Sequence, residues 1–102
     1  MVNMDKVIEQ AIEKEASDIH LMSSLKPMFR IARSLVEMEG AAVLKDEDMY
    51  EIYDYIIRGN IDKDHVFTTT KKLDTSYEYK GIRLRVNLSY ANEVPICTMR
   101  LI

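Results

Sequence analysis

Three arginines near the end of the sequence have the residue type and spacing that best suit a chemical role. Arg83 and Arg85 lie in IRLRVNLSY, whose alternation of apolar and polar residues predicts a strand. Side chains two apart in a strand share a face, and Arg100 falls in the next expected strand. Guanidinium groups stay charged and bind phosphate or carboxylate oxygens through a fork of N–H groups. The arginines could form an anion-binding surface, although charge patterning alone favours a solvated polar face.

Other reactive side chains do not combine into a site. The sequence has no GxxxxGK[ST] phosphate loop, no GxGxxG and only three glycines, so this chain alone is not expected to hydrolyse ATP. His20, His65 and Cys97 are too few and too irregularly spaced for structural zinc. No nucleophile elbow supports a catalytic triad. We therefore expect no metal site, no bound cofactor and no catalytic residue in this chain.

An acidic run and a group of tyrosines have structural explanations. The acidic residues 46–48 stand at the start of an expected helix, where negative charge favours the helix dipole. Tyr53 falls on the apolar stripe of that helix, and Tyr50 and Tyr55 flank the stripe. We interpret the tyrosines as core and rim residues.

Composition favours one globular domain and argues against a nucleic-acid partner. The chain has 102 residues, of which 47% are hydrophobic and 30% charged, enough for one buried core. A net charge of -3 does not suit a protein that neutralises phosphates along DNA or RNA. The sequence contains neither a leader pattern nor an apolar run of about 20 residues, so a cytoplasmic location is expected.

The first half of the chain predicts one helix and then short strands. Apolar residues at helical spacing predict a helix from about Asp5 to Glu15, capped by Asn3. The segment SDIHLM alternates like a half-buried strand, which makes His20 a partly buried strand residue. MFRIA and SLVEM predict two further strands, joined by a tight turn near Ala32 to Ser34.

The second half predicts two helices and three strands. One helix opens at Asp46 and stops at Gly59 and Asn60, and a second is capped by Asp62 and runs to about Thr70. LDTSYEY, IRLRVNLSY and VPICTMRLI then predict strands joined by tight turns. In the middle strand, alternate residues face the core: Ile82, Leu84, Val86 and Leu88. The elements indicate an α+β fold, and Cys97 is expected as an apolar strand residue.

Four motifs in this order resemble a known family. SDIHL, PMFRI, RLRVN and MRLI are similar to segments of the N-terminal domain of PilT-like twitching-motility ATPases, within the type II and type IV secretion ATPase superfamily. The resemblance runs from Ala16 to Ile102. It implies a PAS-like α+β module, an antiparallel sheet packed against helices. Residues 1–102 would then form a single N-terminal domain, with a RecA-like ATPase core beyond the last residue. The apolar end at Leu101 and Ile102 fits such a boundary.

The resemblance also implies the role of the arginines. In this family, arginines on the last strands of the domain reach the γ-phosphate of ATP held by the core. The matching positions are Arg85 in RLRVN and Arg100 in MRLI, with Arg83 as a weaker candidate. The implied cofactors of the full-length protein are ATP and Mg. The implied partners are its own RecA-like domain, neighbouring subunits of a hexamer and the pilus inner-membrane platform protein. The implied location is the inner face of the cytoplasmic membrane.

Two turns depart from the family pattern. The turn after PMFRI contains Ala32 and Arg33 where relatives have Asp-Gly or Asn-Gly. The loop after the RLRVN strand contains Glu93 and Val94 where relatives have a basic, glycine-containing loop. The chain begins its first helix right after Met1, as retraction motors do, so we expect a retraction ATPase rather than an assembly ATPase.

Two functions remain open at the level of sequence. The first is a coupling and regulatory domain of a hexameric ATPase that powers type IV pilus retraction. The alternative is a free-standing PAS-like module that binds a partner protein or a small ligand. A GxxxxGK[ST] segment downstream of Ile102 would distinguish the two.

Overall fold

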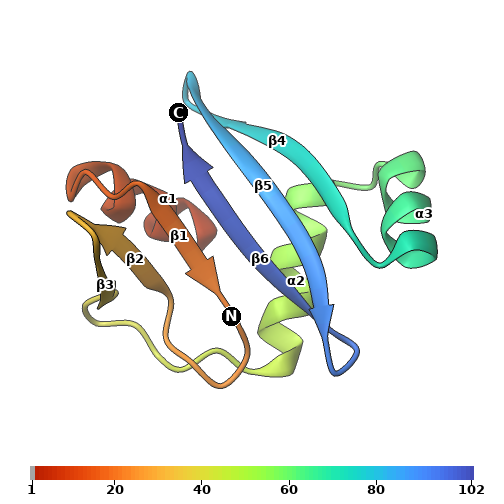
Figure 1. The fold of residues 1–102 in the computed structure, drawn as a ribbon, viewed down its shortest axis with the longest axis horizontal. Helices are drawn as coiled ribbons and strands as arrows, with labels where there is room; N and C mark the ends of the chain where they lie inside the picture. Colours follow the sequence, from red (N-terminus) through yellow and green to blue (C-terminus); the bar gives the residue numbers. More distant parts are fainter. Residues whose placement is uncertain (1) are drawn as a thin grey trace.

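Six antiparallel strands form one sheet in the order β3-β2-β1-β6-β5-β4, and three helices accompany it (Figure 1). The structure is a computed structural model that describes residues 2–102. Its elements are α1 (Met4–Glu13), β1 (Asp18–Leu21), β2 (Met28–Ile31), β3 (Ser34–Glu37), α2 (Asp46–Ile57), α3 (Ile61–Thr70), β4 (Leu73–Tyr79), β5 (Ile82–Ala91) and β6 (Val94–Leu101). The expected α+β class is confirmed.

Helices α1 and α2 cover one face of the sheet, and α3 lies beyond β4 (Figure 1). Asn3 caps α1 as expected, because its side-chain oxygen accepts a hydrogen bond from the Lys6 backbone N–H at 3.1 Å. The expected cap of α3 was wrong. Asn60 accepts from the backbone N–H of Lys63 at 3.0 Å, so α3 begins before Asp62. An Asn oxygen at the N-cap reaches the first turn as well as an Asp oxygen does.

The end of α2 also differs from the expectation by one residue. The left-handed conformation begins at Arg58, with φ of 50°, and continues at Gly59, with φ of 74°. Nε of Arg58 donates to the Tyr55 carbonyl at 3.2 Å, and its guanidinium donates to the Tyr77 hydroxyl. The helix is therefore capped at Arg58, one residue before the glycine that the sequence indicated.

The core lies between the sheet and the two helices. Alternate residues of β5 and β6 point toward it, and Leu84, Val86, Leu88 and Met99 are fully buried. Cys97 shares this face, and burial raises the pKa of its thiol to about 12, so the thiol stays protonated at neutral pH. The intervening side chains of the same strands lie on the other, open face of the sheet. This alternation places Arg83, Arg85 and Arg100 on the open face of the sheet.

The β2–β3 hairpin forms with the turn expected from the sequence. Ala32 and Arg33 take φ values of 47° and 73° between the paired residues Ile31 and Ser34. Two successive positive φ angles are the geometry of a type I′ turn, which Asn-Gly normally supplies. No helix among residues 2–102 is long and apolar enough to cross a membrane.

Candidate functional site

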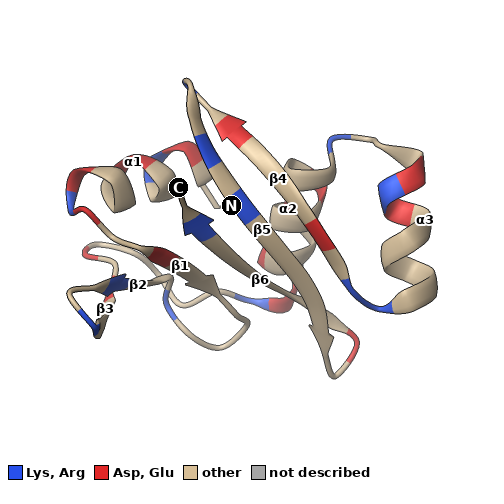
Figure 2. Cartoon of the chain, turned by 45° about the horizontal axis from the view of Figure 1, so that its top comes forward, with Lys and Arg blue, Asp and Glu red and all other residues tan. Residues whose placement is uncertain are grey.

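A row of charged residues crosses the open face of the sheet. Backbone pairing places Arg30 of β2 opposite Asp18 of β1, Asp18 opposite Arg100 of β6, and Arg100 opposite Arg85 of β5. Directly paired residues of a sheet share a face, so these four side chains form one line. In Figure 2, the blue segments of β5 and β6 lie between the red segments of β1 and β4. The row brings together Arg85 and Arg100, which are 15 positions apart in sequence.

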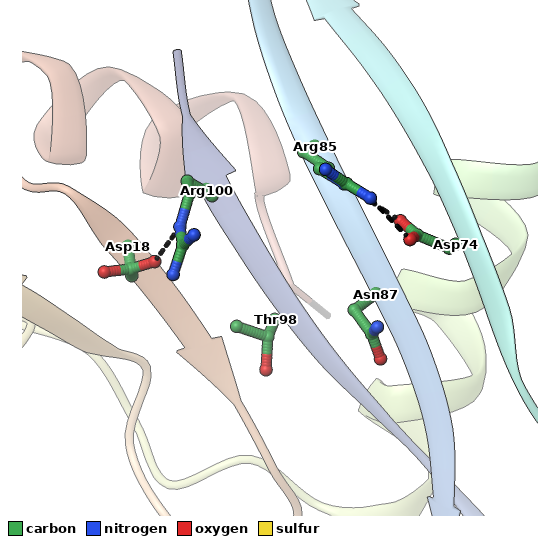
Figure 3. Close-up of a pocket in the computed structure, with 6 residues that line it drawn as sticks. All are labelled: Asp18, Asp74, Arg85, Asn87, Thr98 and Arg100. Carbon is green, nitrogen blue, oxygen red and sulfur yellow. Dashed lines mark hydrogen bonds and ion pairs between the residues drawn. The ribbon is translucent and has the colours of Figure 1, made fainter.

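A hollow of about 250 Å³ lies over this row on the sheet surface. Its lining is polar throughout: Asp18, Asp74, Arg85, Asn87, Thr98 and Arg100 (Figure 3). The two guanidinium groups turn away from each other, that of Arg100 toward β1 and that of Arg85 toward β4. Like charges directly opposite each other in a sheet repel. Each arginine is therefore held by an acid on the strand outside the pair.

Asp18 holds Arg100 by one edge of its guanidinium. Arg100 donates from Nε to Asp18 Oδ1 at 3.2 Å. The other oxygen, Oδ2, accepts from the Ser17 hydroxyl at 2.9 Å and lies 3.8 Å from Nε of Arg30. Asp18 is 7% exposed and is the one buried charged side chain among residues 2–102. A buried carboxylate keeps its charge only when it is paired and hydrogen-bonded, and these contacts meet that requirement.

Asp74 holds Arg85 by two hydrogen bonds in a more exposed position. Arg85 donates from Nε to Oδ1 at 3.3 Å and from Nη2 to Oδ2 at 2.9 Å. The Arg85 side chain is 65% exposed and the Asp74 side chain 51% exposed. An ion pair that faces water this openly is screened and contributes little to stability.

Hydrogen bonds hold the pKa of both carboxyl groups below the usual value. Burial by itself would raise the pKa of Asp18, but the hydrogen bonds from Ser17 and Arg100 outweigh it and hold the pKa below its usual value. The hydrogen bonds from Arg85 lower the pKa of Asp74. At neutral pH both acids are ionised, so the four groups form two compensated ion pairs.

The structure brings together two of the three arginines predicted from the sequence. Arg85 and Arg100 line the hollow, whereas Arg83 pairs across the sheet with Glu78 and does not line it. Sequence reasoning missed the two acids, Asp18 and Asp74. Both stand in motifs that were quoted for other reasons, SDIHL and LDTSYEY. Each acid lies on a strand next to one that carries an arginine of the hollow. The presence of an acid in each of these two motifs was the signal that could have pointed to the ion pairs.

The other candidate residues occupy structural positions. His20 is half-buried in β1, as expected, and its Nε2 has no hydrogen-bond partner in the described part of the chain. Tyr53 stacks on Phe67 with ring centroids 4.9 Å apart. Tyr55 donates to Asp5 at 2.6 Å and links α1 to α2. Residues 2–102 contain no group of three His, Cys, Asp or Glu side chains placed to hold a metal ion.

Comparisons with known proteins identify the fold. The pilus retraction motor PilT, solved with bound ADP, superposes with a TM-score of 0.87 over 98% of this chain at 22% sequence identity. The chain has the fold of part of a pilus retraction motor. The similarity to PilT-like ATPases expected from the four motifs is confirmed at the level of fold. This chain corresponds to 29% of the PilT chain.

Two further ATPases share the fold. The Legionella pneumophila ATPase DotB matches with a TM-score of 0.79 at 23% identity, over 97% of this chain and 28% of DotB. The Yersinia pseudotuberculosis ATPase DotB matches with a TM-score of 0.79 at 17% identity, over 97% of this chain and 29% of that protein. No protein-family model matches the sequence, and no curated relative was found by sequence. The chain spans less than a third of the length of each of these three proteins.

Proposed function

We propose that this chain is the N-terminal coupling and regulatory domain of a longer, hexameric ATPase that powers type IV pilus retraction. In this account the domain is PAS-like and does not hydrolyse ATP itself. It contributes Arg85 and Arg100 toward the γ-phosphate of ATP held by a RecA-like core that follows residue 102. Sensing the γ-phosphate would couple hydrolysis to movement of the domain against the core.

The observation that carries the proposal is the position of the two arginines. Arg85 and Arg100 are direct neighbours across β5 and β6, on the face of the sheet that the helices leave open. Both side chains are largely exposed, at 65% and 73%. Two guanidinium groups at the surface can meet a phosphate on another domain. The fold shared with PilT, whose structure contains ADP, supports the same assignment.

The residues of the hollow fit the outer end of a phosphate chain and not a whole nucleotide. The lining offers two guanidinium groups, each paired with a carboxylate, together with an amide and a hydroxyl. It has no apolar side chain on which a base could stack. Bound ATP would supply the phosphoryl group for transfer, with Mg held by the core. This chain's own residues would bind and orient the terminal phosphate oxygens and keep their charge balanced.

The remaining partners follow from the same proposal. The domain would contact its own RecA-like core, neighbouring subunits of the hexamer and the pilus inner-membrane platform protein. The protein would then work in the cytoplasm at the inner face of the cytoplasmic membrane. No nucleic-acid partner is proposed, in keeping with the net charge of -3.

ATP turnover by the longer chain tests the proposal. Arg85→Ala and Arg100→Ala should each lower turnover by about 100-fold, the scale observed when a phosphate- or oxyanion-stabilising group is removed. Arg83→Ala is the matched control, because it removes the same charge from the same face of β5 outside the hollow. If all three variants turn over like the unmodified protein, the role assigned to the arginines is wrong.

A further inference from the structure

The two arginines of the hollow are held in different ways. Arg100 uses only Nε in its bond to Asp18, and its two terminal nitrogens make no hydrogen bond with residues 2–102. In Figure 3 the dashed line from the Asp18 carboxylate runs to Nε of Arg100. Arg85 instead engages Asp74 with both Nε and Nη2. One fork is therefore available to an anion and the other is largely occupied.

The two acids differ in the same sense. Asp18 is held on both oxygens and is 7% exposed, so it is fixed in place. The Asp74 side chain is 51% exposed, against 10% for the Asp18 side chain, and it pairs with Arg85. A carboxylate that is fixed in place also orients the arginine bonded to it. The arginine then has fewer rotamers to lose when it binds a phosphate. A mobile carboxylate on an exposed pair competes with any incoming anion for the same N–H groups.

We infer that Asp18 is a positioning residue that presents the fork of Arg100 to a terminal phosphate, whereas Asp74 is a competing counterion that Arg85 must leave before it can bind the phosphate. This inference rests on the proposed function. It also gives the order in which the two arginines bind the phosphate. Arg100 binds it without rearrangement, and Arg85 binds it after its hydrogen bonds to Asp74 break. Because the Asp74–Arg85 pair is solvated, opening it costs little free energy.

Simple electrostatics gives a different expectation. Removing any negative charge beside the hollow should strengthen the binding of an anion, so Asp18→Asn and Asp74→Asn would act in the same direction. Positioning and competition act in opposite directions. Asp18→Asn should lower kcat/KM for ATP because Arg100 loses its orientation. Asp74→Asn should raise kcat/KM because Arg85 is released.

The experiment is kcat/KM for ATP in the longer chain that carries the core. We expect Asp18→Asn to lower kcat/KM by about tenfold and Asp74→Asn to raise it by about threefold, within the range that charge-assisted hydrogen bonds contribute. Glu78→Gln is the control, since it removes a negative charge from the same face of β4, opposite Arg83. A change in the same direction for Asp18→Asn and Asp74→Asn overturns the inference. If Arg85→Ala and Arg100→Ala turn over ATP as fast as the unmodified protein, the proposed function is wrong, and the inference with it.

Two further measurements separate positioning from a loss of folding. In the 102-residue chain, the Nε–Hε resonance of Arg100 should shift and exchange faster with water in Asp18→Asn, whereas that of Arg85 should not. An unchanged Arg100 resonance would contradict the anchoring. Arg100→Lys keeps the charge but has no fixed fork, so it should lose about as much kcat/KM as Arg100→Ala. Full activity of the lysine variant would contradict the inference even if Asp18→Asn does not fold.

Discussion

Neighbouring residues on the same strand of this sheet face two different environments. Met99 points into the core and is fully buried, while the next residue, Arg100, has a side chain that is 73% exposed. The same contrast separates Val86 from Arg85 on β5. Both faces are built from one backbone with a period of two. The covered face therefore determines whether the chain folds, and the open face can change its chemistry with little effect on folding.

The largest expected effect comes from shortening a side chain on the covered face. Met99→Ala removes buried methylene and sulfur contacts from the centre of the core and should lower the free energy of unfolding by about 2–5 kcal/mol. Urea unfolding followed by circular dichroism measures the change. Arg85→Ala is the comparison on the open face and should cost no more than about 0.5 kcal/mol, because its ion pair is exposed. Similar losses in the two variants would mean that the faces are not independent.

The alternation behind this contrast was readable from the sequence. LDTSYEY, IRLRVNLSY and the helix from Asp46 have a clear hydrophobic period over seven residues or more, and the structure confirms these elements. The alternating pattern also placed Arg85 on the outer face of its strand correctly. Pairing of β1 with β6 could not be predicted this way, because no local pattern reports which distant strand will lie alongside.

The burial of Asp18 was hidden for that reason. Alternation places Asp18 on the outer face, where an acid is usually exposed. Its burial depends on Arg30 and Arg100, which flank it in space from 12 and 82 positions along the chain. The expected cap of α3 was wrong, whereas that of α1 was confirmed. Asn60 and Asp62 are both suitable capping residues, so residue type alone does not decide between them.

Asp18 is the exception to the separation of the faces, and its removal has the next largest expected effect. Asp18→Asn should lower the free energy of unfolding by about 1–2 kcal/mol at pH 7, because the buried hydrogen bonds lose a charged acceptor. Asp74→Asn, on the exposed pair, should cost about 0.5 kcal/mol or less. Equal losses from the two substitutions would contradict the difference in burial.

The same substitution has a predictable pH dependence. The folded pKa of Asp18 lies below its unfolded value near 3.8, so its contribution to stability is present above pH 4 and is lost as the pH falls through the folded pKa. The difference in unfolding free energy between the unmodified chain and Asp18→Asn should therefore shrink toward zero in acid. Urea unfolding from pH 7 to the lowest pH at which both chains fold measures this. A constant difference would show that the ionised form is not the one being stabilised.

The smallest expected effect is a gain in stability at the β2–β3 turn. Ala32 and Arg33 take positive φ angles that residues with a Cβ adopt at a cost. Replacing them together with Asn and Gly should raise the free energy of unfolding by about 0.5–1 kcal/mol. Because the turn lies outside the hollow, ATP turnover by the longer chain should stay the same. A loss of turnover would link the hairpin to the function of the open face.

Whether this chain binds ATP without the core is best measured by titration calorimetry. The titration is run in parallel on the 102-residue chain and on the chain extended through the next domain. We expect no measurable heat of binding for the short chain and tight binding for the longer one, because the arginines act on a nucleotide that the core holds. Tight binding by the short chain alone would contradict the role proposed for the arginines and favour a self-contained ligand-binding module.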